Sequence, residues 1–241
     1  MAYTLVTGAS SDIGISICQA LEAVGHKLLL SDVSEDALVE ARTRLKSPDL
    51  HLIMPLDLSD SENVAEVLSA FMADNQVNVS NAVFAAGIFA IKPIKLIDYG
   101  FLRKSFDIAL LSIWGIMRVL IAKKTNCGYL RSVVLISSVS AKIGAKGYSV
   151  YGAVKAGMLG MMKSMASELA PNCRINAVLP GGIRTRTTNF IYEAQEAPTP
   201  RYILGDGDKA DIANMVEFLL SDKSRWITGQ EFIVDGGLTS N

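Results

Sequence analysis

Short apolar runs alternate with amphipathic segments along most of the chain. The apolar runs are of strand length and lie at residues 3–7, 27–30, 51–56, 82–85, 132–136, 174–179 and 231–234. Between them, helical periodicity extends to about residue 24 after the first run, and covers residues 37–45, 61–74, 97–124, 149–170 and 209–220. The cluster Ser59-Asp60-Ser61 is predicted to cap the helix over residues 61–74. Strands that alternate with helices, without an internal repeat, predict an α/β fold with one doubly wound, seven-stranded parallel sheet and helices on both faces.

Ligands of such sheets bind beyond the carboxyl ends of the strands. Polar or glycine-bearing stretches follow several of the predicted strands, so we expect them to meet at one edge of the sheet. These stretches are the loop from Gly8 to Gly14, Asp32, Ala86-Gly87, Ser138 and Pro180-Gly181.

The first of these stretches is a glycine loop, Gly8-Ala-Ser-Ser-Asp-Ile-Gly14, between a strand and a helix. This arrangement points backbone N–H groups and a helix N-terminus at a phosphate. Gly8 permits a tight turn, and Gly14 permits close approach to the helix. Asp32 ends the second strand, where a carboxylate can accept hydrogen bonds from an adenosine ribose. Taken singly, the glycines fit an ordinary loop and Asp32 fits a helix cap; their joint spacing favours dinucleotide binding.

A second candidate site is formed by Ser138, Tyr151 and Lys155. Residues four apart lie on one face of a helix, so Tyr151 and Lys155 can reach the same cleft. A phenol has an ordinary pKa of about 10, and a neighbouring ammonium favours its ionised form, so we expect Tyr151 to exchange protons near neutral pH. Ser138 follows a strand and can hold a substrate oxygen. Among seven tyrosines, a Tyr-x-x-x-Lys pattern alone would be a structural coincidence.

Composition excludes several other functions. With 241 residues, half of them apolar, the chain is long enough for one domain over residues 1–241. The net charge of −1 gives no reason to expect nucleic-acid or anionic-membrane binding, and no apolar run reaches the roughly 18–20 residues of a membrane span. The first residues enter a strand without a secretion signal, and the three cysteines have no metal spacing, so we expect a cytoplasmic protein without a metal site.

The motifs, taken in order, resemble those of the short-chain dehydrogenase/reductase family, in its compact single-domain form with a Rossmann-like fold. Residues 7–14 resemble the TGxxxGIG cofactor loop of the family, with Asp12 in place of the middle glycine. Ser138, Tyr151 and Lys155 match the catalytic serine, tyrosine and lysine in order and spacing. Further matches are Asp57-Leu58, Ala85-Ala86-Gly87 in place of Asn-Ala-Gly, and the stretches at 174–176, 180–185 and 227–237.

The resemblance implies an oxidoreductase that interconverts a secondary alcohol and a ketone. Tyr151 would exchange the substrate proton while hydride passes to or from the nicotinamide, Lys155 would lower the pKa of the phenol and bind the nicotinamide ribose, and Ser138 would orient the substrate oxygen. Ile183 and Thr185 would hold the carboxamide. The implied cofactor set is Gly8, Ser10, Ser11, Asp12, Ile13, Gly14, Asp32, Val33, Asp57, Leu58, Ala85, Ala86, Gly87, Tyr151, Lys155, Pro180, Gly181, Ile183 and Thr185.

Asp32 also predicts which cofactor is used. Its carboxylate suits the free ribose hydroxyls of NAD(H) and would repel the extra phosphate of NADP(H). Val33 follows it, and the glycine loop holds no lysine or arginine that would attract that phosphate. We therefore expect NAD(H) to be preferred over NADP(H).

Three departures from the family pattern bear on activity. Ala109 stands where the family commonly has an asparagine that supports a local helix distortion and a water chain to the lysine, so we expect an impaired or rerouted proton relay. Asp12 is expected to cap the following helix, but its charge lies close to the cofactor phosphates. Ala85 removes a further polar contact near the adenosine. These three departures leave open a dinucleotide-binding scaffold or sensor with weak catalysis.

The substrate loop of the family falls at about residues 186–207, which are polar and mixed here and favour a small or polar substrate over a steroid or long acyl chain. An NADH-using 3-oxoacyl-thioester reductase remains the enzymatic alternative. Three arginines fit either an anionic substrate or the solvated surface: Arg184, Arg186 and Arg201. Ile143 and Tyr148 are candidates for the pocket wall. The apolar helices around Trp114 and Met158, together with the resemblance, imply a homotetramer or homodimer.

Overall fold

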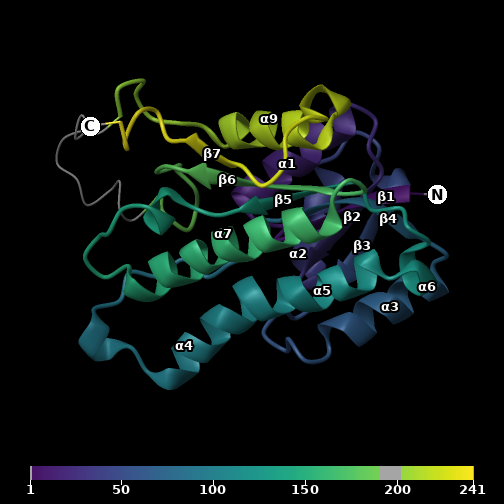
Figure 1. Ribbon diagram of the computed structural model, residues 1–241, viewed down its shortest axis with the longest axis horizontal. Helices are drawn as coiled ribbons and strands as arrows, with labels where there is room; N and C mark the ends of the chain where they lie inside the picture. Colours follow the sequence, from purple (N-terminus) through teal and green to yellow (C-terminus); the bar gives the residue numbers. More distant parts are fainter. Residues whose placement is uncertain (1, 190–201, 241) are drawn as a thin grey trace.

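The computed structural model of the protein describes residues 2–189 and 202–240, and in these residues it contains a seven-stranded sheet (Figure 1). The strand order is β3-β2-β1-β4-β5-β6-β7, and each neighbouring pair is parallel. The predicted fold class is therefore confirmed. The strands are β1 (Ala2–Thr7), β2 (Leu28–Asp32), β3 (Leu52–Pro55), β4 (Asn78–Phe84), β5 (Ser132–Ile136), β6 (Arg174–Pro180) and β7 (Glu231–Val234).

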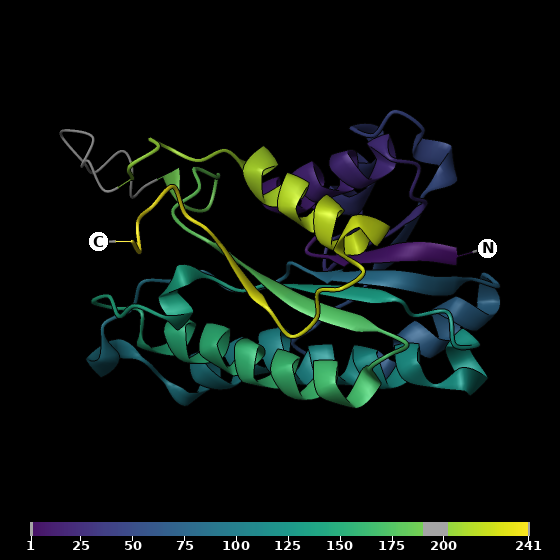
Figure 2. The same cartoon turned by 45° about the horizontal axis from the view of Figure 1, so that its top comes forward.

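Helices cover both faces of this sheet, as Figure 2 shows edge-on. Residues of α1 (Asp12–Ala23), α2 (Glu35–Thr43) and α9 (Lys209–Leu220) pack on one face. Residues of α3 (Val64–Asp74), α5 (Ser112–Ile121) and α7 (Ser149–Leu169) pack on the other. The remaining helical segments are α4 (Tyr99–Phe106), a π-helical turn (Asp107–Leu111), α6 (Lys123–Asn126) and the 3₁₀ turns Pro48–Leu50, Ile94–Leu96, Val139–Ala141 and Asp222–Ser224.

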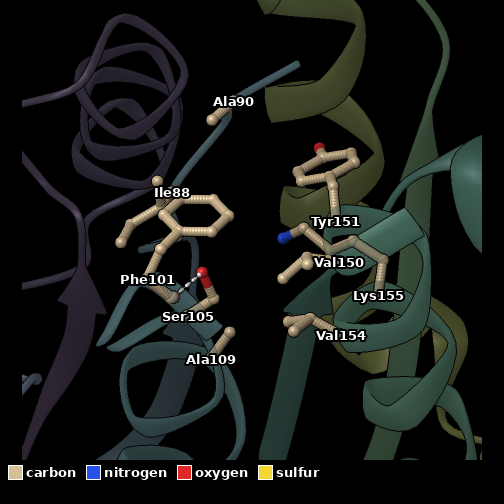
Figure 3. A pocket seen from close by; sticks show the side chains of 10 residues that line it. Ile88, Ala90, Phe101, Ser105, Ala109, Val150, Tyr151, Val154 and Lys155 are labelled. Carbon is tan, nitrogen blue, oxygen red and sulfur yellow. Dashed lines mark hydrogen bonds between the residues drawn. The ribbon is translucent and has the colours of Figure 1, made fainter. Parts of the chain in front are cut away.

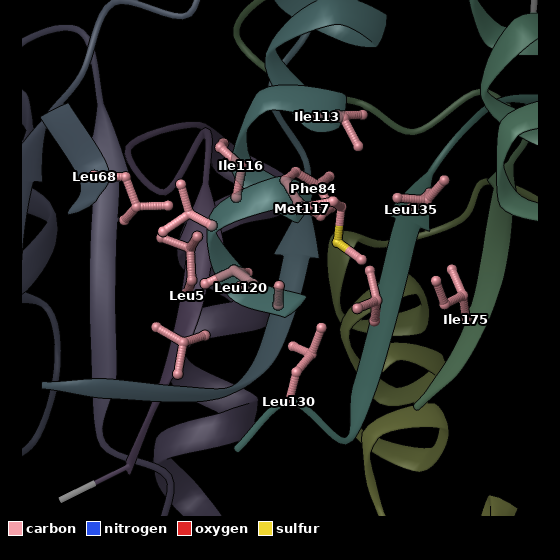
Figure 4. Close-up of a cluster of buried hydrophobic side chains, with 14 of the residues drawn as sticks. Leu5, Leu68, Phe84, Ile113, Ile116, Met117, Leu120, Leu130, Leu135 and Ile175 are labelled. Atoms are coloured by element: carbon pink, nitrogen blue, oxygen red, sulfur yellow. The ribbon is translucent and has the colours of Figure 1, made fainter. Parts of the chain in front are cut away.

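The side-chain alternation of the strands divides the core into two layers. Leu5 belongs to the layer beneath α3, α5 and α7, whereas Val6 belongs to the layer beneath α1 and α9, because successive strand residues point to opposite faces. Around Leu5, the first layer includes Phe84, Ile116 and Leu120, each at most 1% exposed (Figure 4). Burial on both sides explains why the strands read as continuous apolar runs.

Residues 97–124, predicted as one helix, form α4, the π turn, α5 and α6 instead. In the π turn, the N–H of Ser112 reaches the carbonyl of Asp107, five residues earlier. The break after α5 occurs at Ala122, which adopts an extended conformation with ψ of 119°. The prediction of one continuous helix over residues 97–124 is therefore wrong.

The predicted helix over residues 61–74 begins later, at Val64, and its predicted cap by residues 59–61 is wrong. Asn63 occupies the N-cap position without a side-chain capping bond. The neighbouring polar groups are used elsewhere: the hydroxyl of Ser59 donates to Asp57 at 2.7 Å and that of Ser61 donates to Asp107 at 3.0 Å. A second shift occurs at β4, which begins at Asn78 instead of residue 82.

Across the described ranges, 2–189 and 202–240, no helix combines the length and the apolar character needed to cross a membrane.

Candidate active site

The loops that follow β1 and β4 touch at the point where the strand order reverses. Chain order runs outward from β1 through β2 to β3 on one side, and through β4 to β7 on the other. Gly8 has φ of +69°, and a Cβ on it would lie 2.7 Å from the backbone nitrogen of Ala86. Only glycine fits both the conformation and the approach. The crevice at such a reversal is where doubly wound sheets bind their ligands.

The glycine loop packs against the start of α1 as predicted, but its capping residue differs. The hydroxyl of Ser11 accepts from the N–H of Gly14 at 3.0 Å and donates to the carbonyl of Gly8 at 2.7 Å. A Cβ on Gly14 would lie 2.1 Å from that same carbonyl oxygen. Ser11 is therefore the N-cap of α1, and the expectation that Asp12 caps this helix is wrong.

Asp12 instead binds Arg186, in the segment after β6. Its Oδ2 accepts from the backbone N–H of Arg186 at 2.6 Å, and its Oδ1 accepts from Nε at 3.0 Å. The guanidinium also donates to the carbonyl of Ser10 at 3.1 Å. The pair joins the glycine loop to the beginning of the predicted substrate loop. Positions 190–201 of that loop, including Arg201, lie outside the described residues.

Asp32 is held beside the glycine loop by hydrogen bonds. Its Oδ2 accepts from the hydroxyl of Ser10 at 2.6 Å and from the Ser10 N–H at 3.2 Å, and its Oδ1 accepts from the N–H of Val33 at 2.8 Å. Capping of α2 belongs to Ser34, whose hydroxyl accepts from the N–H of Ala37. The Asp32 carboxylate thus has a defined position at the tip of β2, and it does not cap α2.

Asp57 and Leu58 follow β3, the neighbour of β2. The Asp57 carboxylate accepts from the hydroxyl and the N–H of Ser59 at 2.7 and 2.8 Å. These hydrogen bonds hold the pKa of Asp57 below its usual 3.8, so it is ionised at neutral pH. Leu58 is buried in the core.

Ser138, Tyr151 and Lys155 come together at the end of β5 and the first turns of α7. Ser138 is extended, its hydroxyl accepts from the N–H of Ser140 at 3.1 Å, and it shares a hydrogen bond with Tyr151. Lys155 Nζ donates to the carbonyl of Ile136 at 2.8 Å and lies 5.7 Å from the centroid of the Tyr151 ring. The predicted i, i+4 geometry is therefore present.

Burial governs the acidity of these two groups. Desolvation raises the pKa of Tyr151, more than the hydrogen bond from Ser138 lowers it, and the neighbouring Tyr148 raises it further. Desolvation also lowers the pKa of Lys155 from 10.5 to about 8. We expected the neighbouring ammonium to lower the pKa of the phenol; in this structure the pKa of Tyr151 is raised instead, chiefly by burial.

An aromatic cluster, not predicted as a whole, surrounds the phenol. The rings of Phe89, Tyr148 and Tyr151 make edge-to-face contacts, with Phe89 5.3 Å from Tyr151 and 5.8 Å from Tyr148 between centroids. Phe89 was missed by the sequence reasoning. The available signal was its place two residues after Gly87, in a loop that leaves the same edge of the sheet.

A small cavity lies on the α4 side of Tyr151 and Lys155 (Figure 3). Its volume is about 10 Å³. Ala109, in the π turn, lines it and is 3% exposed. The π turn forms although alanine has no polar side chain to support it, and the impaired or rerouted proton relay stays a prediction. The other lining residues are Gly87, Ile88, Ala90, Phe101, Ser105, Val150, Tyr151, Val154 and Lys155.

A larger cleft of about 450 Å³ lies beside the 3₁₀ turn that follows Ser138. Ile143 and Tyr148, both candidates for the pocket wall, line it together with Ile94, Ser140 and Lys146. The cleft is mostly apolar with a cationic residue among its lining. Its size and lining suit a small organic molecule.

The stretch after β6 completes the edge of the sheet. Pro180 ends the strand, and a Cβ on Gly181 would lie 2.8 Å from the Cα of Asp235. Ile183 is buried and forms a β-bridge with Gly207. The N–H of Thr185 donates to the hydroxyl of Thr188 at 2.9 Å. These contacts give the stretch a defined path beside the site.

Cysteine, histidine and acidic side chains do not gather into a metal-binding group in the part of the chain that the structure describes. Two of the thiols, Cys18 and Cys173, are buried, and burial raises the pKa of each to about 12. At neutral pH both are therefore protonated packing groups.

Comparison with known proteins agrees with this geometry. A family model described as enoyl-(acyl carrier protein) reductase matches residues 8–239. The chain is 34% identical over 238 residues to the 3-oxoacyl-(acyl-carrier-protein) reductase FabG of Rickettsia prowazekii, a match that covers 98% of this chain and 95% of that protein. It is 30% identical over 251 residues to a cyclopentanol dehydrogenase of Comamonas sp., with coverage of 98% and 96%.

Solved structures show the same architecture. A 4-hydroxyisoleucine dehydrogenase complexed with NADH matches with a TM-score of 0.90 and 26% identity, and the match covers 100% of both chains. A glucose/ribitol-type dehydrogenase from Brucella melitensis matches with a TM-score of 0.88 and 27% identity, covering 98% of this chain and 96% of that one. From the sheet, the site and these matches together, the chain belongs to the short-chain dehydrogenase/reductase family and is an oxidoreductase that acts on CH–OH groups.

Proposed function

We propose that this enzyme interconverts a small or polar secondary alcohol and its ketone with NAD(H), and that Tyr151 is its general acid and base. The observation that carries the proposal is the meeting of Ser138, Tyr151 and Lys155 at the sheet edge that also bears the glycine loop. Tyr151 lies within hydrogen-bond reach of Ser138, so both can contact one substrate oxygen.

The residues present fit a dinucleotide. Gly8 and Gly14 leave no room for side chains where the loop meets Ala86 and α1, so backbone N–H groups can approach a pyrophosphate closely. Asp32 holds a fixed carboxylate at the tip of β2, where we propose that the adenosine ribose binds. Ile183 and Thr185 are proposed to hold the carboxamide. When bound, the cofactor supplies or accepts the hydride.

The protein's own part in the reaction is positioning and proton transfer. Because burial raises the pKa of Tyr151, the phenol carries its proton at neutral pH, the state required to donate to a ketone oxygen. Ser138 orients that oxygen. Lys155, with a pKa of about 8, is mostly charged at pH 7 and stabilises negative charge on the phenol when the proton leaves.

The choice of NAD(H) rests on Asp32. Both oxygens of its carboxylate are engaged by groups of this chain, Ser10 and Val33, which hold the charge in place. A phosphate at the ribose would meet this charge at close range. Arg186 does not neutralise the charge of Asp32, because its guanidinium is paired with Asp12.

A panel of secondary alcohols and ketones, assayed with NAD(H) and NADP(H), tests the proposal. We expect turnover of at least one compound, with a higher kcat/KM for NAD(H). Equal or better use of NADP(H) would overturn the cofactor assignment. Tight NADH binding without turnover of any compound would favour the alternative of a dinucleotide-binding scaffold or sensor.

A 3-oxoacyl-thioester reductase using NADH is the second candidate. It is supported by the similarity to the 3-oxoacyl reductase of Rickettsia prowazekii and by the open cleft beside Ser140, with Lys146 available to an anionic acyl carrier. Including 3-oxoacyl thioesters in the panel separates the two candidates. A kcat/KM for a thioester well above that for every small ketone would make this candidate the better one.

We further propose that the enzyme is a homotetramer or homodimer. The support is the outer face formed by the last residue of the π turn and by α5, where Leu111, Trp114 and Ile121 are 53%, 54% and 42% exposed. Exposed apolar groups of this size on one helix are typical of an association surface.

A further inference from the structure

Glu231, on the edge strand β7, binds two lysine ammonium groups at once. Its Oε2 pairs with Lys142 Nζ, and its Oε1 lies 2.7 Å from Lys163 Nζ. The side chain of the glutamate is 13% exposed, whereas those of the two lysines are 41% and 59% exposed. Hydrogen bonds from Lys142 and Lys163 hold the pKa of Glu231 below its usual 4.5, so the carboxylate is charged at neutral pH.

The three charged groups come from three separate parts of the fold. Glu231 lies beside Ala177 of β6 in the sheet, and Ala177 belongs to the core layer beneath α7, so the glutamate side chain lies on that face. Lys163 belongs to α7, and Lys142 ends the 3₁₀ turn Val139–Ala141 that follows β5. The carboxylate therefore joins this turn both to the sheet edge and to α7.

Lys142 closes a turn that begins at Ser138. The N–H of Lys142 donates to the carbonyl of Val139 at 2.8 Å, and the N–H of Ala141 donates to the carbonyl of Ser138 at 3.0 Å. The Ser138 hydroxyl accepts from the N–H of Ser140 at 3.1 Å, inside the same turn. The backbone of this turn thus determines where the Ser138 hydroxyl lies.

The same turn supplies part of the wall of the cleft of about 450 Å³. Ser140 and Ile143 line this cleft, and Lys142, which stands between them along the chain, has its ammonium bound to Glu231. Movement of Lys142 would therefore displace the cleft wall and the Ser138 hydroxyl together.

We propose that Glu231 is a positioning residue of the active site: by holding Lys142, it fixes the turn that carries Ser138 and the adjoining cleft wall. Lys163 binds the same carboxylate from α7 but does not belong to the turn. The kinetic consequence rests on the proposed function, because it requires that Ser138 orient the substrate oxygen. The fixed turn itself does not depend on that function.

The first test is hydrogen–deuterium exchange of the cofactor-free protein, followed in peptides that cover residues 138–143. Glu231→Gln removes the charge with little change in shape. We expect it to speed exchange of the hydrogen-bonded amides of residues 141–143 about fivefold, because the turn opens more often without its ion pair. Unchanged exchange would overturn the proposal. The result needs no substrate, so it is independent of the proposed function.

The second test is kinetic, on whichever substrate the panel identifies. Glu231→Gln and Lys142→Met are each expected to lower kcat/KM about fivefold, with NADH affinity unchanged, because the glycine loop and Asp32 follow β1 and β2. Combining the two is expected to cost no more than either alone, since both remove the same pair. Lys142→Arg keeps the cation and is expected to retain most of the wild-type kcat/KM. Losses that add in the double variant would overturn the proposal.

Lys163→Met provides the matched control. It removes the other cation bound to Glu231, from a helix position outside the turn. We expect kcat/KM and the exchange of residues 141–143 to stay within about twofold of wild type. An equal kinetic loss in Lys163→Met, or a wild-type kcat/KM in Lys142→Met, would overturn the positioning role of Glu231.

Discussion

Burial of the Lys155 ammonium lowers the stability of the folded state. The pKa of Lys155 falls from 10.5 to about 8 because the surroundings disfavour the charged form. Between these two values the unfolded chain binds a proton at this group and the folded chain does not, so stability rises with pH across this window. At pH 7 both states are protonated and the full cost of burying the charge is present.

Replacement of Lys155 by methionine makes this cost measurable. We expect the unfolding free energy of the variant, relative to wild type, to be higher at pH 7 than at pH 10.5 by about 3 kcal/mol. The reason is that only the wild type carries the buried charge. Urea unfolding of both proteins at a series of pH values measures the difference. A difference that does not change between pH 8 and 10.5 would contradict the lowered pKa.

The identity of the candidate catalytic residues was predictable because their spacing is local. Tyr151 and Lys155 are one helical turn apart, and Ser138 follows a strand that the apolar pattern marks clearly. The acidity of the phenol was not predictable. It depends chiefly on burial, and one of the groups that pack against the phenol ring is Phe89, from a loop that sequence spacing does not place next to α7.

At the scale of elements, the pair between Asp12 and Arg186 ties the start of α1 to the segment after β6. The two residues are 174 positions apart, and no local pattern links them. In the sequence, Asp12 looks like a helix cap or an obstacle to phosphate binding. In the fold its charge is offset by a guanidinium, although Arg186 is 67% exposed at its side chain and the interaction is screened accordingly.

Removing Arg186 should therefore expose the charge of Asp12 to the cofactor. We expect Arg186→Ala to weaken NADH binding roughly threefold, as for a partly exposed ion pair. The double variant Asp12→Asn with Arg186→Ala should regain near wild-type affinity, because the repelling charge is gone. Fluorescence titration with NADH measures both. Equal weakening in the single and double variants would show that Arg186 acts by another route.

Two further details of the helices could not be predicted from the sequence, and each has a physical reason. The π turn over Asp107–Leu111 adds one residue to a helical turn, and the surrounding apolar periodicity continues across it. The Ser-Asp-Ser stretch before α3 has the composition of a cap, but its first serine binds Asp57 and its second binds Asp107. In both cases tertiary contacts override a local preference.

For the whole molecule, the sheet and its covering helices follow from the order of apolar and amphipathic segments. The predicted site stretches meet because parallel strands bring their carboxyl ends to one edge, and Gly8 contacts the loop of Ala86 there. The oligomeric state, by contrast, cannot be predicted from the order of apolar and amphipathic segments. Met117 and Leu120 are core residues, whereas Trp114 on the same helix is exposed, with the Arg118 guanidinium 5.2 Å from its ring.

The exposed face of α5 predicts association. Sedimentation velocity is expected to show a dimer or tetramer for the wild type, and Trp114→Glu is expected to shift the distribution towards smaller species, because it places a charge in an apolar contact. Val39→Glu, at an exposed apolar residue of α2, changes the charge by the same amount and serves as the control. A wild-type protein that sediments only as a monomer would remove this proposal.

The central claim is that the phenol of Tyr151 exchanges a proton with the substrate beside the nicotinamide. Its most direct test compares kcat for Tyr151→Phe and Tyr148→Phe, with NADH affinity measured in parallel, since each variant removes one hydroxyl from the same aromatic cluster. The account predicts a loss of roughly 10²–10⁴ in kcat for Tyr151→Phe with NADH binding retained, and a kcat within about threefold of wild type for Tyr148→Phe. A Tyr151→Phe enzyme that keeps wild-type kcat would contradict it.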